Sequence, residues 1–318
     1  MIDFRYHVVS LVAVLLALAT GILVGSSVVE GPLLQRLTKT TDLLRDHTDD
    51  LQRQVQDLER GQRFASAFAQ QVAPDLVAGQ LTGESVALIS LPSSNADVVG
   101  ATADLIEQAG GQISSRIKVT SKYSDAVQEN GLNELVTRLA PAGTEWPGGA
   151  NVYDRAGIQL ASALVTDQFV LAAQPLDASA TQLLDGYQDA DLIDIGGDPA
   201  GPATMAVLIA GTPGGAGASI QRSAGAYLSL ARALDERSRG VVVAGTEASA
   251  TERGVVSAIR ANSDVANVVS TIDVADSPIG RIGVVYALEE QSRGDSGQYG
   301  IAGTTDGPLP DLTKEGQQ

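Results

Sequence analysis

The sequence predicts an α/β protein with a single N-terminal transmembrane helix, a coiled-coil stalk, and a mostly parallel, doubly wound α/β domain outside the cytoplasm. Three observations support this prediction. Residues 8–29 contain no charged side chain, residues 33–73 carry leucine at a seven-residue spacing, and residues 80–293 alternate short apolar runs with helical patterns. Residues 1–7 are then a short cytoplasmic N-terminus. Residues 294–318, rich in Gly, Asp and Pro, are expected to form a flexible tail.

The uncharged run over residues 8–29 is long enough to cross a membrane, since a helix rises about 1.5 Å per residue and the hydrocarbon core is roughly 30 Å thick. A cleavable secretory signal is the alternative, because Ala17-Leu18-Ala19 resembles a cleavage site. The apolar run continues past that site to Val29, which favours a retained anchor. The flanking charges orient it only weakly. An anchor with almost nothing ahead of it usually exports the chain behind it, so we expect the N-terminus inside and the bulk outside.

Small residues recur every four positions within this run, at Ala13, Ala17, Gly21 and Gly25. On a helix they form one ridge, and the last two have the GxxxG spacing that lets two membrane helices approach closely. The alternative is that Ala and Gly are simply common in membrane spans. We interpret the ridge as one half of a dimer interface because the following segment also has a self-association pattern.

That segment follows Gly31-Pro32, which is expected to end or bend the membrane helix. Leucine then occupies every d position of a heptad pattern, whereas two of the four a positions are Thr, so the seam is weaker than an ideal coiled coil. The alternative is an amphipathic helix that packs on its own domain. We predict a homodimer whose interface contains Ala17, Gly21, Gly25, Leu34, Leu37, Leu44, Leu51, Val55 and Leu58.

The domain over residues 80–293 is predicted from alternating patterns. Strands are expected at 85–91, 113–119, 191–195, 206–210, 240–244, 265–270 and 280–288. Helices are expected at about 95–109, 126–139, 153–165, 178–187, 218–237 and 252–261, with a short one ending at Arg293.

Composition excludes several functions. The formal net charge of −17 and the absence of Lys and Arg clusters argue against nucleic acid as a partner. The chain has no Cys, which removes thiolate catalysis, Fe–S clusters and Cys-based zinc sites. No His follows Leu51, so the predicted domain has no base for a Ser-His triad. We therefore expect neither an enzyme nor a bound cofactor.

Two weak candidate sites remain. His47, at a g position beside Asp46, Asp49 and Asp50, could bind a metal ion in a dimer, although a solvated surface residue is the favoured interpretation. The glycine-rich loop over residues 211–217, between a strand and a helix, is the best candidate for a phosphate cradle. It lacks both the Gly-Lys-Ser/Thr of a P-loop and the third glycine of a dinucleotide fingerprint, so a plain loop is favoured.

Two sets of stretches form a recognisable pattern: Met1-Ile2, Arg5, 7–14, 16–19 and 21–25 near the N-terminus, and 270–273, 280–282, 287–288 and 297–300 near the C-terminus. With these stretches the chain resembles the actinobacterial copper transporter family of MctB-like proteins, also known as SteB-like. The resemblance implies copper transport or efflux and copper homeostasis in the cell envelope, through a protein described as pore-like in the outer membrane. For SteB-like members it implies a cytoplasmic SteA-like partner and control of a peptidoglycan hydrolase in daughter-cell separation. It implies no catalytic or metal-binding residues.

Physical arguments favour the second implication. Copper(I) prefers Cys, Met or His ligands, and this chain has no Cys, two Met and two His. One apolar helix makes no conduit and belongs in a cytoplasmic membrane, whereas an outer-membrane pore is expected to be a closed barrel. The sequence therefore favours a dimeric scaffold over a copper conduit, and both hypotheses are carried forward.

Overall fold

The computed structural model describes residues 4–141, 143–168, 175–215, 217–251 and 253–311, with side chains outside 26–38. The chain divides into two compact units, Met1–Ala65 and Ser66–Gln318.

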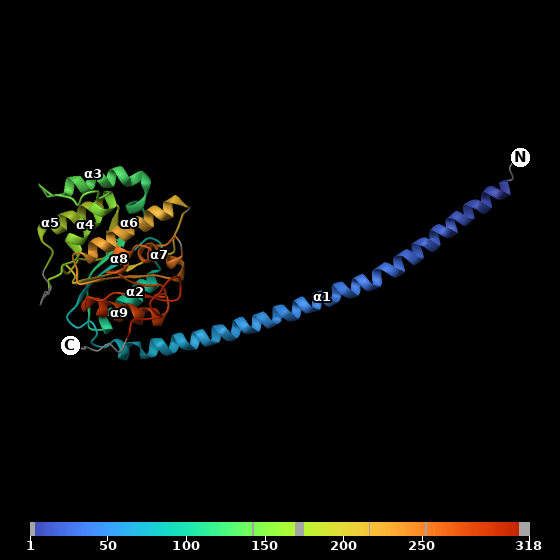
Figure 1. Ribbon diagram of the computed structural model, residues 1–318, viewed down its shortest axis with the longest axis horizontal. Coiled ribbons are helices and arrows are strands. Elements are labelled where there is room, and N and C mark those ends of the chain that lie inside the picture. Colours follow the sequence, from blue (N-terminus) through green and yellow to red (C-terminus); the bar gives the residue numbers. More distant parts are fainter. Residues whose placement is uncertain (1–3, 142, 169–174, 216, 252, 312–318) are drawn as a thin grey trace. The chain divides into compact units, whose positions relative to one another are not determined.

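One long helix, α1 (Phe4–Val77), makes up the described part of the first unit and continues into the second (Figure 1). Its segment Phe4–Gly25 is long and apolar enough to cross a membrane. The backbone stays helical through Gly31-Pro32, so of the two expected effects, an end or a bend of the membrane helix, the end is wrong. A single Pro removes one backbone hydrogen bond, and the helical turns on both sides keep theirs. Exposed ion pairs between neighbouring turns, such as Arg63 with Glu59, support the later part of the helix.

The described part of the second unit contains a seven-stranded sheet in the order β3-β2-β1-β4-β5-β6-β7. Every adjacent pair is parallel except β2 with β3, which confirms the predicted mostly parallel sheet. The strands are β1 (Ser85–Ser90), β2 (Gln112–Val119), β3 (Ile193–Ile195), β4 (Met205–Ile209), β5 (Val241–Ala244), β6 (Ser270–Ile272) and β7 (Gln298–Tyr299).

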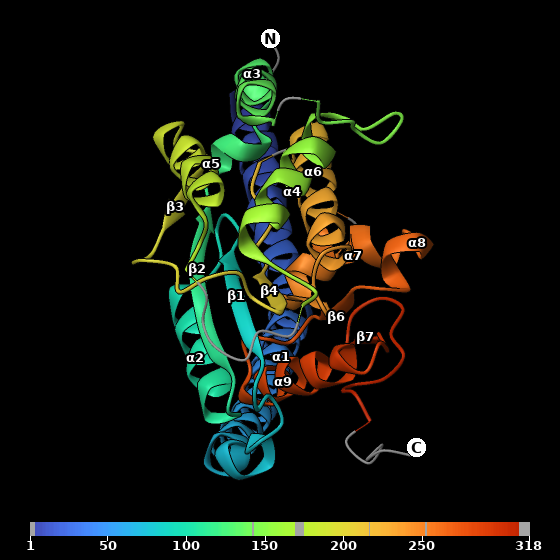
Figure 2. The same cartoon turned by 90° about the vertical axis from the view of Figure 1, so that its left-hand side faces the viewer.

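Helices cover both faces of this sheet (Figures 1 and 2). Successive residues of β1 point to opposite faces: Ala87 and Ile89 join one buried cluster, while Val86 and Leu88 join the other. The first cluster lies under α3 (Glu129–Leu139), α4 (Val152–Leu164), α5 (Ala178–Asp189), α6 (Ala218–Asp235) and α7 (Val255–Arg260). The second lies under the end of α1, α2 (Ala96–Gln108) and α9 (Pro278–Ser292). Short helices η1 (Ser121–Ser124), η2 (Ala126–Gln128), η3 (Glu247–Ala250) and α8 (Ser263–Ala266) complete the described elements.

Three expectations about the C-terminal part are wrong. The expected strand 280–288 lies within helix α9, because Ser277 caps that helix, Pro278 begins it and most of its residues are buried. A helix buried nearly all round shows no amphipathic period, so its apolar run resembles a strand. The expected strand 265–270 overlaps α8, and the strand β6 begins only at Ser270. The expected tail contains β7, which pairs with β6.

Two glycines in helices on the same face of the sheet give opposite predictions for a Gly→Ala change. A Cβ at Gly280 would overlap the backbone carbonyl of Val274, so Gly280→Ala is expected to lower the free energy of unfolding by about 1–3 kcal/mol. Exposed Gly100 in α2 has open space around it. Gly100→Ala is therefore expected to raise the free energy of unfolding by about 0.5–1 kcal/mol. Denaturation of the full chain in detergent, followed by fluorescence of Trp146, the only tryptophan, measures both. Equal effects of the two changes would contradict this packing.

Candidate functional site

The carboxyl ends of the parallel strands form the edge of the sheet where functional loops meet. Strand β1 lies between β2 and β4, so the chain leaves β1 toward one side of the sheet and later returns to the other. In open α/β sheets such a reversal leaves a crevice outside the strand ends, where ligands usually bind. The described residues of the glycine-rich loop 211–217, the phosphate-cradle candidate, follow β4 at this edge.

A cavity of about 330 Å³ lies at this place. It is lined by the loops after β1, β2 and β4, by the first turns of α6, and by the segment that leads into α7. The lining residues are Leu91, Pro92, Ser93, Ser121, Ser124, Asp125, Ala126, Gly211, Thr212, Pro213, Gly214, Ser219, Ile220, Arg222, Ser223, Ala224, Tyr227, Arg253, Gly254 and Val255. Its volume is typical of sites for small molecules.

Backbone contact between two loops shapes one wall of this cavity. A Cβ at Gly211 would overlap the carbonyl oxygen of Pro92 and the backbone of Ser93, so the loops after β4 and β1 approach as closely as only glycine allows. Ser93 itself has a φ of 63°, in the left-handed region that non-glycine residues seldom adopt. Strained residues of this kind cluster at ligand sites.

The polar lining that the described residues provide consists of hydroxyls, two arginines and one carboxylate. The hydroxyl of Ser124 lies 2.8 Å from that of Ser223 and 3.1 Å from that of Tyr227, which ties η1 to α6. Arg222 is half-buried and Arg253 is exposed. Asp125 accepts a hydrogen bond from the backbone N–H of Val127 at 3.0 Å and caps η2.

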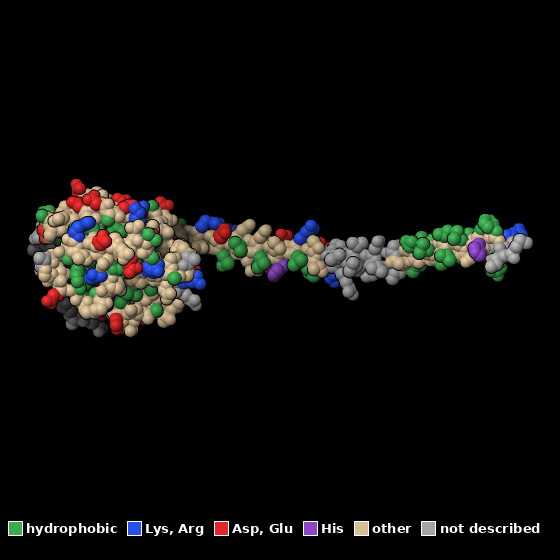
Figure 3. Space-filling model, turned by 90° about the horizontal axis from the view of Figure 1, so that it is seen from above, with side chains coloured by type: hydrophobic (Ala, Val, Ile, Leu, Met, Phe, Trp, Pro, Cys, Tyr) green, Lys and Arg blue, Asp and Glu red, His purple; other side chains and the backbone are tan. Residues whose placement is uncertain are grey.

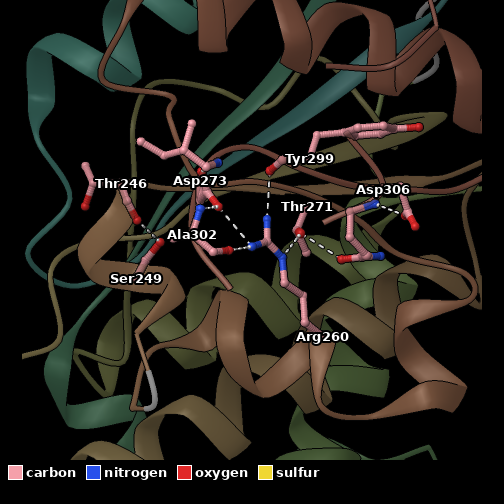
Figure 4. Close-up of polar contacts among 10 residues, drawn as sticks. Thr246, Ser249, Arg260, Thr271, Asp273, Tyr299, Ala302 and Asp306 are labelled. Atoms are coloured by element: carbon pink, nitrogen blue, oxygen red, sulfur yellow. Dashed lines mark hydrogen bonds and ion pairs between the residues drawn. The ribbon is translucent and has the colours of Figure 1, made fainter. Parts of the chain in front are cut away.

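A second polar cluster lies beyond the end of β6 (Figure 4). The guanidinium of Arg260, on α7, is paired with Asp273, whose side chain is fully buried. The Nη1–Oδ2 distance is 2.9 Å. Arg260 also donates to the hydroxyl of Thr271 and to the carbonyl oxygens of Ala302 and Tyr299. Because both charges are paired and hydrogen-bonded, this buried ion pair avoids the cost of an isolated charge.

The same cluster fixes the backbone after β7. Asp273 accepts hydrogen bonds from the amides of Ile301 and Ala302, at 2.8 and 3.0 Å. Gly300 has a φ of 133°, and a Cβ there would overlap the Asp273 carboxylate. Burial raises the pKa of Tyr299, and its hydrogen bond to Glu290 raises it further. The C-terminal stretches 270–273 and 297–300 of the family resemblance therefore meet in one folded cluster.

The predicted dimer residues all lie on α1. A Cβ added at Gly21 or Gly25 would meet no atom within 4 Å, and Ala17 is exposed. The side chains of Leu34 and Leu37 lie outside the described ones. The remaining residues form an exposed apolar stripe, with exposed fractions of 62% for Leu44, 47% for Leu51, 52% for Val55 and 74% for Leu58. Figure 3 shows separate apolar side chains on the described part of the helix near the α/β unit. The stripe fits the predicted seam, and the dimer itself stays a prediction.

His47 is exposed on the same helix. Across the described residues, no group of three or more His, Cys, Asp or Glu side chains is placed so that it could hold a metal ion. Within that part of the chain, the structure therefore brings no further ligands to His47.

Sequence analysis predicted neither the arginines that line the cavity nor the polar cluster around Arg260. Arg222, Arg253 and Arg260 belong to no motif, and their roles depend on loops and strands that are distant in the chain. The one available signal was the glycine-rich loop, whose residues 211–214 border the cavity.

The family and the similar proteins found by comparison match nearly the whole chain. The family described as "Copper transport outer membrane protein, MctB" matches residues 1–310. Proteins named "Copper transporter MctB" from Mycobacterium tuberculosis and Mycobacterium bovis are 30% identical over 319 residues, which is 97% of this chain and 98% of theirs. A protein of the same name from Mycobacterium leprae is 29% identical over 322 residues, 95% of this chain and 96% of its own.

The buried ion pair predicts a large loss of stability on neutralisation. Asp273→Asn keeps the side-chain shape and leaves the buried Arg260 charge without its counter-ion, so the free energy of unfolding is expected to fall by about 3–5 kcal/mol. Arg232→Gln, which breaks an exposed pair with Glu236, is the control, with an expected loss below about 1 kcal/mol. Trp146 fluorescence during denaturation measures both. If Asp273→Asn lowers the free energy of unfolding no more than Arg232→Gln does, the ion pair does not stabilise this region.

Proposed function

Because this chain belongs to the MctB family of copper transport proteins, we propose that it is a membrane-anchored cell-envelope protein that acts in copper transport and copper homeostasis. The observation that carries the proposal is the length of the match, which includes both the apolar N-terminal helix and the α/β unit. Relatives named as copper transporters align with this chain over nearly its whole length. The reaction is movement of copper, and the proposal includes no catalysis by this chain.

The proposed topology follows from the single apolar helix. The segment Phe4–Gly25 spans the cytoplasmic membrane with its N-terminal end inside, and the α/β unit lies outside. The family description names the outer membrane. A lone helix that satisfies its own backbone hydrogen bonds suits any bilayer, and the cytoplasmic membrane is where such helices are ordinarily inserted.

In the proposed mechanism, the protein works as part of an assembly, and copper is what the assembly moves. Copper(I) favours Cys, Met or His, and the chain has no Cys, two Met and two His. One helix also encloses no path across a membrane. Several copies, or a copy with a partner protein, are needed to supply ligands and a path. The exposed stripe of Leu44, Leu51, Val55 and Leu58 supports a parallel coiled coil, which also places the ridge of Ala17, Gly21 and Gly25 between two membrane helices.

The same stripe favours a second candidate function, a scaffold. In this alternative, the dimer joins a SteA-like partner inside the cell to a peptidoglycan hydrolase outside and controls daughter-cell separation. Such a role needs a membrane-crossing helix and a binding surface, and it needs no metal ligands and no catalytic residues. Both candidates depend on self-association through α1.

The seam predicts which positions of α1 meet their copies. The chain has no Cys, so a single introduced Cys reports one position. Leu51→Cys, at d, is expected to form a cross-linked dimer efficiently in membranes with a short thiol-specific reagent, because d positions face each other in a parallel coiled coil. Gln56→Cys, at the outward b position, is the matched control and is expected to stay mostly monomeric. Equal cross-linking at the two positions would argue against the seam.

Loss of the gene separates the two candidate functions in cells, and a charge in the seam tests the self-association that both need. In a strain lacking the gene, we expect a higher copper content and lower copper tolerance, and the scaffold alternative predicts chains of unseparated cells. Leu51→Asp is expected to fail to restore the affected property, because two buried carboxylates repel, whereas exposed Gln56→Asp restores it. For this comparison, the Leu51→Asp and Gln56→Asp variants must be present in the membrane in equal amounts. Normal copper content in the deletion strain would reject the copper role, and normal separation would reject the scaffold.

A further inference from the structure

We propose that the cavity at the carboxyl ends of β1 and β4 binds a small phosphate-bearing ligand of about mononucleotide size. Neither copper handling nor the scaffold role uses this cavity. The inference stands on its position in the sheet, its charged groups and its hydroxyl lining.

The position is the one at which an open α/β sheet offers a crevice. The loops after β1 and β4 diverge to opposite faces, and both line the cavity. The volume of about 330 Å³ is enough for a sugar with a phosphate and a small base, and larger than a bare phosphate requires.

The charged side chains that line the cavity favour an anionic ligand. A positively charged lining is unusual in a chain whose net charge is −17. Among the described residues, two arginines and one carboxylate line the cavity. Within the described residues, neither Arg222 nor Arg253 makes an ion pair, whereas Asp125 is engaged in capping η2. Arginine without a carboxylate partner at the wall of a cavity is well suited to phosphate, since its planar fork can donate two parallel hydrogen bonds.

Neutral donors add to these charges. The hydroxyl of Ser124 lies within 3.1 Å of those of Ser223 and Tyr227, and all three residues line the cavity between η1 and α6. Residues of the first turn of α6 also line the cavity. The positive end of that helix therefore adds to the attraction of an oxyanion.

The rest of the lining suits an organic group attached to the phosphate. Leu91, Ile220 and Val255 supply apolar side chains, and Tyr227 supplies an aromatic ring. A phosphorylated sugar or nucleoside would place its phosphate toward the arginines and its body against these residues. Inorganic phosphate would use only part of the site.

The test is isothermal titration of the full chain in detergent micelles with adenosine 5′-monophosphate, ribose 5-phosphate, inorganic phosphate and adenosine. We expect the two phosphorylated compounds to bind more tightly than inorganic phosphate, with adenosine showing no binding. Arg222→Gln is expected to raise Kd at least about tenfold, since a charge-assisted bidentate contact is lost. Arg253→Gln changes a more exposed side chain and is expected to raise Kd less. It serves as a second variant if Arg222→Gln does not fold.

Arg138→Gln is the matched control, because it removes one exposed arginine from α3 outside the cavity, and Kd should stay unchanged. Thermal unfolding confirms that each variant is folded. Three results overturn the proposal: no binding of either phosphorylated compound at millimolar concentration, adenosine binding as tightly as its monophosphate, or equal Kd values for the wild type, Arg222→Gln and Arg253→Gln.

Discussion

Burial of the last turns of α1 against the sheet is the interaction on which the second unit depends. Ala69, Ala73 and Val77 are almost fully buried with residues of β1, α2 and α9. The hydroxyl of Tyr286, on α9, donates to the carbonyl oxygen of Leu76 at 2.7 Å, which satisfies one of the free carbonyls at the end of the helix. Without these turns, one face of the sheet would lose part of its cover. The end of α1 is therefore a component of the hydrophobic core and not a linker.

The sequence was most informative where a pattern is local. The apolar N-terminal helix and the strands up to β5 follow from runs of neighbouring residues, and these elements appear in the structure. The helix α9 was mistaken for a strand because it is buried nearly all round, which removes the amphipathic period that distinguishes the two. The burial depends on β5 and β6, whose positions the pattern around Gly280 does not contain.

The candidate cavity was predictable only in part, for the same physical reason. A glycine-rich turn after a strand is visible in the sequence, and its residues 211–214 border the cavity. Arg222 and Arg253 reach that cavity from α6 and from the segment before α7, and only the strand order places them together. Likewise, Arg260 and Asp273 are separated by 13 residues and bind a backbone segment that begins still later in the chain. No spacing rule connects such groups.

The charges of the cavity also constrain where copper can be held. The two arginines of the lining repel a metal cation, and hydroxyls are poor ligands for copper(I), which prefers sulfur and imidazole. Asp125, the carboxylate among the described lining residues, is already an N-cap. The cavity is therefore chemically suited to an anion and unsuited to the proposed cargo. His47, on α1 beside the exposed leucine stripe, is one of the chain's two histidines and therefore carries a ligand type that copper(I) prefers.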